Sequence, residues 1–262
     1  MTKSNNMLKK KKYLNSWGLV IVATTLSCSC VTSVWAAKYD LTKEQDQLKG
    51  KIFQLEWGNN ESLINGSRGS SINNIKGYTS IIDLINLKKY KEARDKINRQ
   101  IKNKPREFYG YNLLALLEIQ EKNIDAAKYN YLKSIELNES NLVAYTGLAR
   151  ISIANNDYDI AKEYLQKGVD INAKYLGNYI LLAGIANKQN NKQEAEKYLL
   201  IAYDIAESLS EKIEAGRVLS VFYTRQSKPE KALDLAEKIR KEYPKENEAD
   251  SFYVIALITN NR

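Results

Sequence analysis

The sequence contains no histidine, and its only two cysteines, Cys28 and Cys30, lie near the N-terminus. These absences exclude Ser-His-Asp triads, Cys/His nucleophilic pairs and most zinc sites. Only three prolines and twelve glycines occur among 262 residues, which suits a mostly helical fold. The remaining composition, 44% hydrophobic and 27% charged, is that of an ordinary globular protein. We therefore expect a protein that is not an enzyme and that uses no metal and no cofactor.

The N-terminal residues 1–36 have the order of a secretory signal peptide. Lys3 and the four lysines at 9–12 form a positive start, an apolar run follows at 17–23, and residues 34–36 end in a small residue, Ala36. This order of positive, apolar and small residues is typical of export signals that are cleaved. The leading interpretation is cleavage after Ala36, which leaves the chain in the periplasm or cell envelope.

Two alternatives to cleavage after Ala36 stay open. The uncharged stretch from Tyr13 to Ala37 could remain as a membrane-spanning helix. Cys28 or Cys30 could instead carry a lipid, although neither has the leucine that bacterial lipoproteins prefer three residues earlier. In each case, the chain meets the membrane only through this segment, and its bulk lies outside the cytoplasmic membrane.

The basic charge of the chain comes largely from this segment. The formal net charge is +9, but residues 1–36 hold five lysines and no acidic residue. The remainder is spread as Lys/Glu pairs along helical stretches, which is typical of a solvated face. The sequence therefore predicts no nucleic-acid partner.

Residues 37–73 form a polar segment that precedes the regular part of the chain. Leu41, Leu48, Ile52 and Leu55 share one helical face, which predicts a short helix. The following stretch at 58–74 is rich in Gly, Ser and Asn and lacks the Gly-Lys-Ser/Thr ending of a phosphate-binding loop. We interpret it as a flexible linker.

From residue 74 onward, a pattern recurs every 34 residues. Its clearest copies have a tyrosine, a leucine three residues later, an alanine after the leucine, and a second alanine twelve residues further on. The three clearest copies contain Tyr111, Leu114, Ala115 and Ala127; Tyr145, Leu148, Ala149 and Ala161; and Tyr179, Leu182, Ala183 and Ala195. A fixed period of this size predicts a stack of helical pairs, in which small residues allow close approach and bulky ones fill the space between copies.

These residues resemble the tetratricopeptide repeat (TPR) family, in a form suited to the bacterial envelope. Five copies can be placed, at 74–107, 108–141, 142–175, 176–209 and 213–246, with Ser210 to Lys212 between the last two. Residues 247–259 are similar to the helix that covers the last repeat. The resemblance implies an all-α, right-handed superhelical solenoid of about five helix-turn-helix repeats with a C-terminal capping helix, spanning 74–262.

The resemblance also implies where a partner would bind. In the family, positions 2, 5, 9 and 12 of each first helix line a concave groove, and a protein or peptide binds there. Carried onto this sequence, those positions include Tyr78, Ile82, Tyr109, Asn112, Leu116, Thr146, Arg150, Ile180, Asn187, Arg217 and Val221. The Lys/Asn clamp with which one subgroup holds chaperone C-termini is replaced by Tyr78, Ile82, Leu113, Val143 and Gly147, so that partner class is not expected.

The expected function is a non-enzymatic scaffold or adaptor of the bacterial envelope that binds a protein or peptide segment. An alternative is a lipoprotein that assists assembly of a type IV pilus secretin, or of another envelope secretion or export complex. A module attached to an envelope enzyme complex is a further alternative. The sequence does not discriminate among these.

The leading interpretation of the N-terminus makes a direct prediction. N-terminal sequencing of the mature protein should begin at Ala37, because the small residue Ala36 ends the export signal. Mass spectrometry that finds a lipid on Cys28 or Cys30 would replace this interpretation with membrane anchoring.

Overall fold

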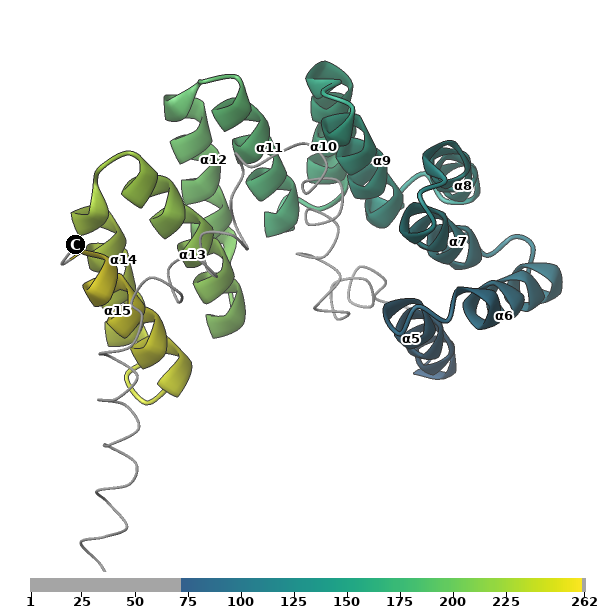
Figure 1. The fold of residues 1–262 in the computed structure, drawn as a ribbon, viewed down its shortest axis with the longest axis horizontal. Helices are drawn as coiled ribbons and strands as arrows, with labels where there is room; N and C mark the ends of the chain where they lie inside the picture. The colour runs from purple at the N-terminus through teal and green to yellow at the C-terminus, as the bar shows by residue number, and fades with distance from the viewer. Residues whose placement is uncertain (1–71, 261–262) are drawn as a thin grey trace, which may run out of the picture.

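The computed structural model describes residues 72–260, and in this range every regular element is a helix. The eleven helices follow one another along an arc (Figure 1). They are α5 (Ile72–Asn86), α6 (Tyr90–Asn103), α7 (Phe108–Gln120), α8 (Ile124–Leu137), α9 (Leu142–Ala154), α10 (Tyr158–Ile171), α11 (Leu176–Lys188), α12 (Lys192–Ile205), α13 (Leu209–Arg225), α14 (Pro229–Glu242) and α15 (Asn247–Asn260).

The helices form five consecutive antiparallel pairs, α5/α6 to α13/α14, and α15 covers the last pair. The first helices α7, α9 and α11 begin at residues 108, 142 and 176, which reproduces the 34-residue spacing of the sequence. Figure 1 shows α5, α7 and α13 on the inner side of the arc and α6, α8 and α14 on its outer side. We call the surface formed by the first helices the inner side. The solenoid of five helical pairs with a capping helix is confirmed.

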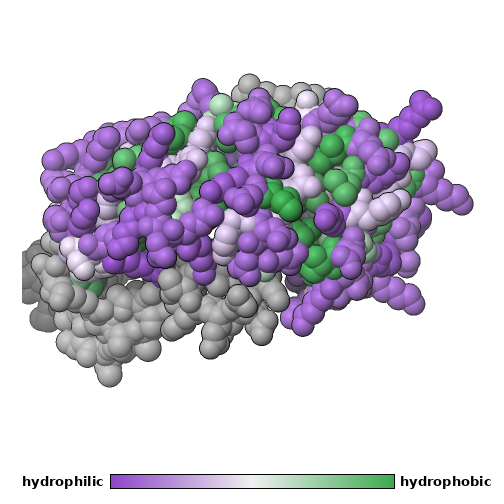
Figure 2. Space-filling view, turned by 90° about the horizontal axis from the view of Figure 1, so that it is seen from above, coloured by the Kyte–Doolittle hydropathy of each residue, from purple (hydrophilic) through white to green (hydrophobic). Residues whose placement is uncertain are grey.

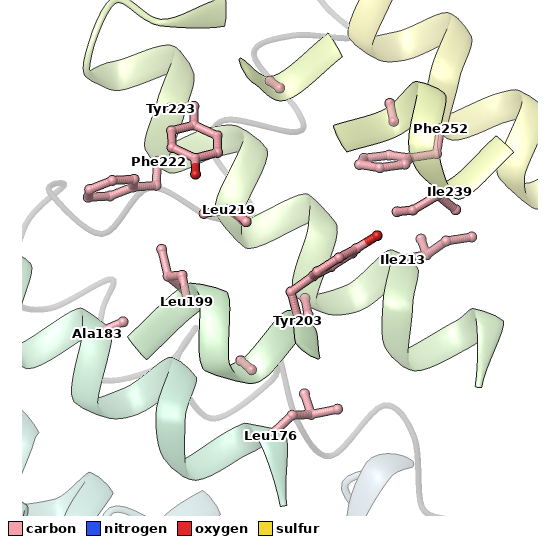
Figure 3. Packing of buried hydrophobic residues seen from close by; sticks show 14 of the residues in the cluster. Leu176, Ala183, Leu199, Tyr203, Ile213, Leu219, Phe222, Tyr223, Ile239 and Phe252 are labelled. Atoms are coloured by element: carbon pink, nitrogen blue, oxygen red, sulfur yellow. The ribbon is translucent and has the colours of Figure 1, made fainter. Parts of the chain in front are cut away.

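Alanines lie where the two helices of a pair meet. The alanines of the first helices, Ala115, Ala149 and Ala183, and those of the second helices, Ala127, Ala161 and Ala195, are all buried. A methyl side chain lets helix backbones approach closely, and larger residues then fill the space between pairs. Figure 3 shows this filling in the C-terminal half, where residues of α11 to α15 form one continuous cluster.

Each first helix ends in the same kind of turn. The residue that leaves the helix has a positive φ angle in all five pairs, and none of these residues is glycine: Lys88, Lys122, Asn156, Asn190 and Ser227. The next backbone N–H donates to the carbonyl five residues earlier, as from Asn123 to Glu118 at 2.7 Å. This hydrogen bond belongs to the Schellman motif, which satisfies carbonyls at a helix C-terminus. The turn is therefore set by backbone geometry that repeats along the arc.

The fifth pair departs from the expected register. Ser210 to Lys212 do not separate two repeats but form the first turn of α13, which runs for 17 residues instead of 13. The reason is a capping box: the Ser208 hydroxyl accepts from the Glu211 N–H at 3.3 Å, and Glu211 Oε2 accepts from the Ser208 N–H at 3.0 Å. This cap moves the helix start to Leu209.

Tyr131 fills the position on α8 that leucine holds in the next two repeats, Leu165 and Leu199. Its ring is fully buried and lies directly against Gly147 of α9, where an added Cβ would collide with the ring. Glycine at 147 is thus required by its neighbour and not by its own backbone. At Gly184 on α11, no atom of the described residues beyond its own helix backbone and chain neighbours lies within 4 Å of an added Cβ.

The export signal, Cys28, Cys30, the expected helix near Leu41 and residues 58–71 of the expected linker lie outside the described residues, so they stay predictions. Residues 72–74, which were also assigned to the linker, instead form the start of α5.

Substitution by alanine should have opposite effects on stability at Gly147 and at Gly184. Gly147→Ala should lower the free energy of unfolding by about 1–3 kcal/mol, because the added methyl overpacks the Tyr131 ring. Gly184→Ala should raise it by about 0.5–1 kcal/mol, because alanine favours a helix interior and meets nothing here. Urea denaturation followed by circular dichroism measures both. Tyr131→Leu should remove most of the penalty of Gly147→Ala, and equal penalties with and without it would refute the assigned contact.

Candidate functional site

The residues that were expected to face a partner lie on the inner side, and they fall into two groups that differ in exposure. Four of them are less than 10% exposed: Asn112, Leu116, Thr146 and Arg150. The other six are half-buried: Tyr78, Tyr109, Ile180, Asn187, Arg217 and Val221. The first group is therefore buried within the fold, and only the second group is partly accessible to a partner. Leu116, like Ile82, belongs to the apolar cluster of the first two pairs.

Asn112 is buried because it connects two neighbouring repeats. Its Oδ1 accepts from the Ser134 hydroxyl of α8 at 2.6 Å and from the Asn141 amide at 3.1 Å, and its own Nδ2 donates to Asn141 Oδ1 at 3.2 Å. Asn141 is also the N-cap of α9, where Oδ1 accepts from the Ala144 N–H at 3.3 Å. Asn112 therefore positions the following repeat, and its amide is not free to bind a partner.

Thr146 makes an equivalent contact one repeat further on. Its hydroxyl donates to Asn178 Oδ1 of α11 at 3.0 Å, and Asn178 is fully buried. The Asn178 amide lies against Gly168 of α10, where an added Cβ would collide with it. Polar contacts of this kind fix the stacking of helices more specifically than apolar contacts alone.

Two aromatic residues meet at the N-terminal end of the inner side. The ring centroids of Tyr78 on α5 and Tyr109 on α7 are 5.2 Å apart, and the Tyr78 hydroxyl donates to Glu107 Oε2 at 3.2 Å. Burial, followed by the charge of Glu107 and the hydrogen bond to it, raises the pKa of Tyr78 well above its ordinary value. These two half-buried rings form an amphipathic edge on the inner side.

The middle of the inner side carries one buried charge, Arg150, with half-buried charges near it. Arg150 on α9 is 3% exposed, and burial lowers its pKa to about 10, against the opposing effects of Tyr175 and Glu214. Burial, with a smaller contribution from Glu211, raises the pKa of Glu214 on α13, although Arg217 and Arg150 oppose this shift. Arg217 Nη2 also lies 4.0 Å from Glu248 Oε1 of α15. Charges of both signs thus follow the inner side from α9 to α15.

Two members of the inner side, Gly184 and Glu214, were missing from the expected site. Both occupy groove positions of the repeat, so the 34-residue register could have located them. Their contribution, a gap and a shielded acid, appears only in the folded arc.

No group of three or more histidine, cysteine, aspartate or glutamate side chains is arranged to hold a metal ion between residues 72 and 260. Within the same residues, no helix has the length and apolarity needed to cross a bilayer.

The arrangement of these helical pairs defines the described part of the chain as a tetratricopeptide repeat fold. No protein-family model matches the sequence, and no curated protein matches it. Among solved structures it is similar to TTC0263, a thermophilic TPR protein of Thermus thermophilus, with 18% identity, 70% of this chain and 98% of that chain covered, and a TM-score of 0.54.

Yeast Tom70 is also similar, with 17% identity and a TM-score of 0.56; the match covers 76% of this chain and 46% of that longer one. The Pseudomonas aeruginosa protein pilF matches at 14% identity and a TM-score of 0.48, over 81% of this chain and 99% of that one. At these identities, the comparisons with TTC0263 and Tom70 confirm the fold that the sequence pattern indicated.

Glu118 on α7 provides a contrast to Glu214. Burial opposes its ionisation most strongly, but hydrogen bonds from Arg94 and Asn123 and the charge of Arg94 together lower its pKa. Arg94 Nη1 on α6 lies 2.6 Å from Glu118 Oε1, and its Nη2 also pairs with Glu121. The same residue type thus carries pKa shifts of opposite sign at two points of the arc.

Replacing each glutamate with glutamine should change stability in opposite directions at neutral pH. A lowered folded pKa contributes stability above the unfolded value near 4.5, and this is lost as pH falls through the folded pKa, so Glu118→Gln should destabilise at pH 7. A raised folded pKa costs stability above that pKa, so Glu214→Gln should stabilise at pH 7. Both differences should shrink as pH falls, because each carboxyl becomes protonated, Glu214 first and Glu118 only below its lowered pKa. Denaturation midpoints at pH 7 and pH 3.5 check this, and shifts of the same sign at pH 7 would contradict the assignment.

Proposed function

We propose that this chain is a non-enzymatic scaffold of the bacterial cell envelope that binds an extended protein segment along the inner side of the arc. The observation that carries the proposal is the stripe of half-buried side chains on α11 and α13. Ile180 and Asn187 are half-buried residues of α11, and Arg217 and Val221 are half-buried residues of α13. Apolar, amide and guanidinium groups in one stripe suit an extended peptide, since apolar contacts supply affinity and polar groups pair with its backbone and acids.

The outer surface has a different character. Figure 2, which shows the molecule from above, has a mainly hydrophilic surface with smaller apolar patches. The large apolar side chains exposed on the second helices α8, α10 and α12 are Ile124, Tyr129, Leu132, Ile160 and Leu200. Scattered apolar residues of this kind are normal on a soluble surface. The inner side therefore remains the better candidate for specific binding.

The location in the envelope rests on the predicted export signal, with the periplasm as the compartment if the signal is cleaved. Lipid attachment at Cys28 or Cys30 would place the same scaffold at a membrane. Assistance to a pilus secretin or another export complex stays an alternative within this proposal, and the partner recovered in the experiment below decides it.

The test replaces the two half-buried polar residues of the stripe and leaves the fully buried ones unchanged. Asn187→Ala/Arg217→Ala should reduce partner capture from envelope extracts by about tenfold or more, because truncating a central arginine in an interface commonly costs about 2 kcal/mol. Neither change removes a core contact, so the melting temperature should stay nearly the same.

The matched control is Gln166→Ala/Lys167→Ala, at two exposed positions of α10 on the second-helix side. It should capture the partner as the wild type does. If the folded Asn187→Ala/Arg217→Ala protein recovers the same partners in the same amounts, the inner side is not the binding surface.

A further inference from the structure

The positive charge that remains beyond the N-terminal signal is concentrated in the first helical pair. Residues 72–107, which form α5, α6 and the turns beside them, hold ten basic and four acidic side chains, a net charge of +6. Residues 108–262 hold twenty basic and twenty-two acidic side chains, a net charge of −2, and residues 37–71 hold five of each sign. The excess is therefore not spread evenly along the chain, but belongs to the end of the arc formed by α5 and α6 (Figure 1).

At the turn between α5 and α6, this charge surrounds an exposed apolar side chain. Leu87 is 68% exposed, the largest fraction for any exposed large hydrophobic residue between 72 and 260. Lys88, Lys89 and Lys91 are exposed beside it, and no acidic residue interrupts residues 87–91. We call Leu87 and these three lysines the basic tip.

The other four turns of the same kind lack this combination. The position of Leu87, directly before the residue with a positive φ angle, holds a polar residue in each of them: Glu121, Asn155, Gln189 and Gln226. The first turn is closed by backbone hydrogen bonds, from the Leu87 N–H to the Asp83 carbonyl at 2.9 Å and from the Lys89 N–H to the Leu84 carbonyl at 2.8 Å. The turn geometry therefore does not require a leucine at this position.

Most of the charge near the tip is not neutralised within the described part of the protein. Lys88 and Lys91 form no ion pair with any described residue, and Lys89 pairs with Glu92 at 3.5 Å between two exposed side chains. Lys102 lies on the same side of α6 as Lys91, about three helical turns further on, and is likewise exposed and unpaired among the described residues. An exposed ion pair such as that of Lys89 contributes little, so all of these charges can face an external anionic surface.

We propose that the basic tip docks the first repeat on the surface of an anionic lipid bilayer. Leu87 inserts at the boundary between headgroups and acyl chains, and the lysines lie among the headgroup phosphates. Each basic residue near an anionic bilayer strengthens binding by a factor of about five. The tip shares no residue with the stripe on α11 and α13, so this inference goes beyond the proposed function and does not depend on it.

Leu87 favours a bilayer over a soluble polyanion. Nucleic acids and acidic proteins pair with lysines but do not require an exposed leucine between them, whereas an interfacial segment combines basic residues with an apolar one that enters the lipid. The predicted export signal also brings the chain to a membrane, whether the signal is cleaved, lipidated or retained. The membrane contact expected through the N-terminal segment alone then gains a second point, on the folded array.

The test uses vesicles and the chain 37–262, which contains every described residue and lacks the predicted signal. This chain should co-sediment with vesicles of phosphatidylcholine and phosphatidylglycerol in equal parts but not with phosphatidylcholine alone, and added salt should weaken the binding because it screens exposed charges. Lys88→Gln/Lys89→Gln/Lys91→Gln should lower binding by about tenfold or more.

The matched control is Lys128→Gln/Lys167→Gln/Lys197→Gln, which removes the same charge from exposed positions of α8, α10 and α12. It should bind the anionic vesicles nearly as well as the unchanged chain. Both triple variants change only exposed side chains, so their melting temperatures should stay nearly the same.

A second measurement follows position 87 directly. The chain 37–262 contains no cysteine, so Leu87→Cys and Val254→Cys can each carry one polarity-sensitive fluorescent label. Val254 is 51% exposed on α15, at the other end of the arc. On anionic vesicles, the emission of the label at position 87 should shift to shorter wavelength, because the label enters the lipid, whereas the emission of the label at position 254 should not change.

Three results would overturn the inference. The first is a chain that does not co-sediment with the anionic vesicles, and the second is an equal loss of binding in the two triple variants, which would assign the effect to net charge alone. The third is unchanged emission at position 87 on vesicles that the chain does bind, which would assign the tip to a soluble polyanion. None of these measurements needs the protein partner, so partner capture that depends on Asn187 and Arg217 would stand if membrane binding failed.

Discussion

Close helix crossing at alanine is the contact on which the rest of this arc depends. Each second helix places one alanine against its partner, and all five are at most 3% exposed: Ala93, Ala127, Ala161, Ala195 and Ala232. Because the methyl groups take so little space, the larger side chains of a pair point toward the neighbouring pairs, where they find their apolar contacts. Each repeat is therefore stabilised by its contacts with the neighbouring repeats, and the inner side forms only when the repeats stack.

Much of this architecture could be predicted from the 34-residue period. The period located Ala161 where two helices meet, because this position depends on local helical geometry that repeats. It did not locate the start of α13, because the capping box of Ser208 and Glu211 competes locally with the register of the repeats. The 34-residue period places a residue on one face of a helix, but it does not show which capping residues set the start of that helix.

The candidate site was harder to predict for a different reason. The sequence assigns a residue to a groove position, but it does not show whether the polar groups of that side chain already have hydrogen-bond partners inside the fold. Asn112 finds its partners Ser134 and Asn141 at separations of 22 and 29 residues, and Thr146 finds Asn178 across 32. Such pairs form only when two repeats stack, and they convert expected binding residues into positioning residues. The half-buried residues on α11 and α13, and the groove position of Gly184, were within reach of sequence reasoning, whereas the open space beside Gly184 was not.

The longer α13 has a consequence for how the chain finds its structure. Near-identical repeats can pair out of order, and such misassembly is a characteristic failure of repeat proteins. The start of α14 lies 37 residues after that of α12, whereas the other second helices follow one another at 34. A stack shifted by one repeat would leave the extra turn of α13 without a matching neighbour. The irregular repeat therefore disfavours a stack shifted by one repeat, because the 37-residue spacing occurs once among the described second helices.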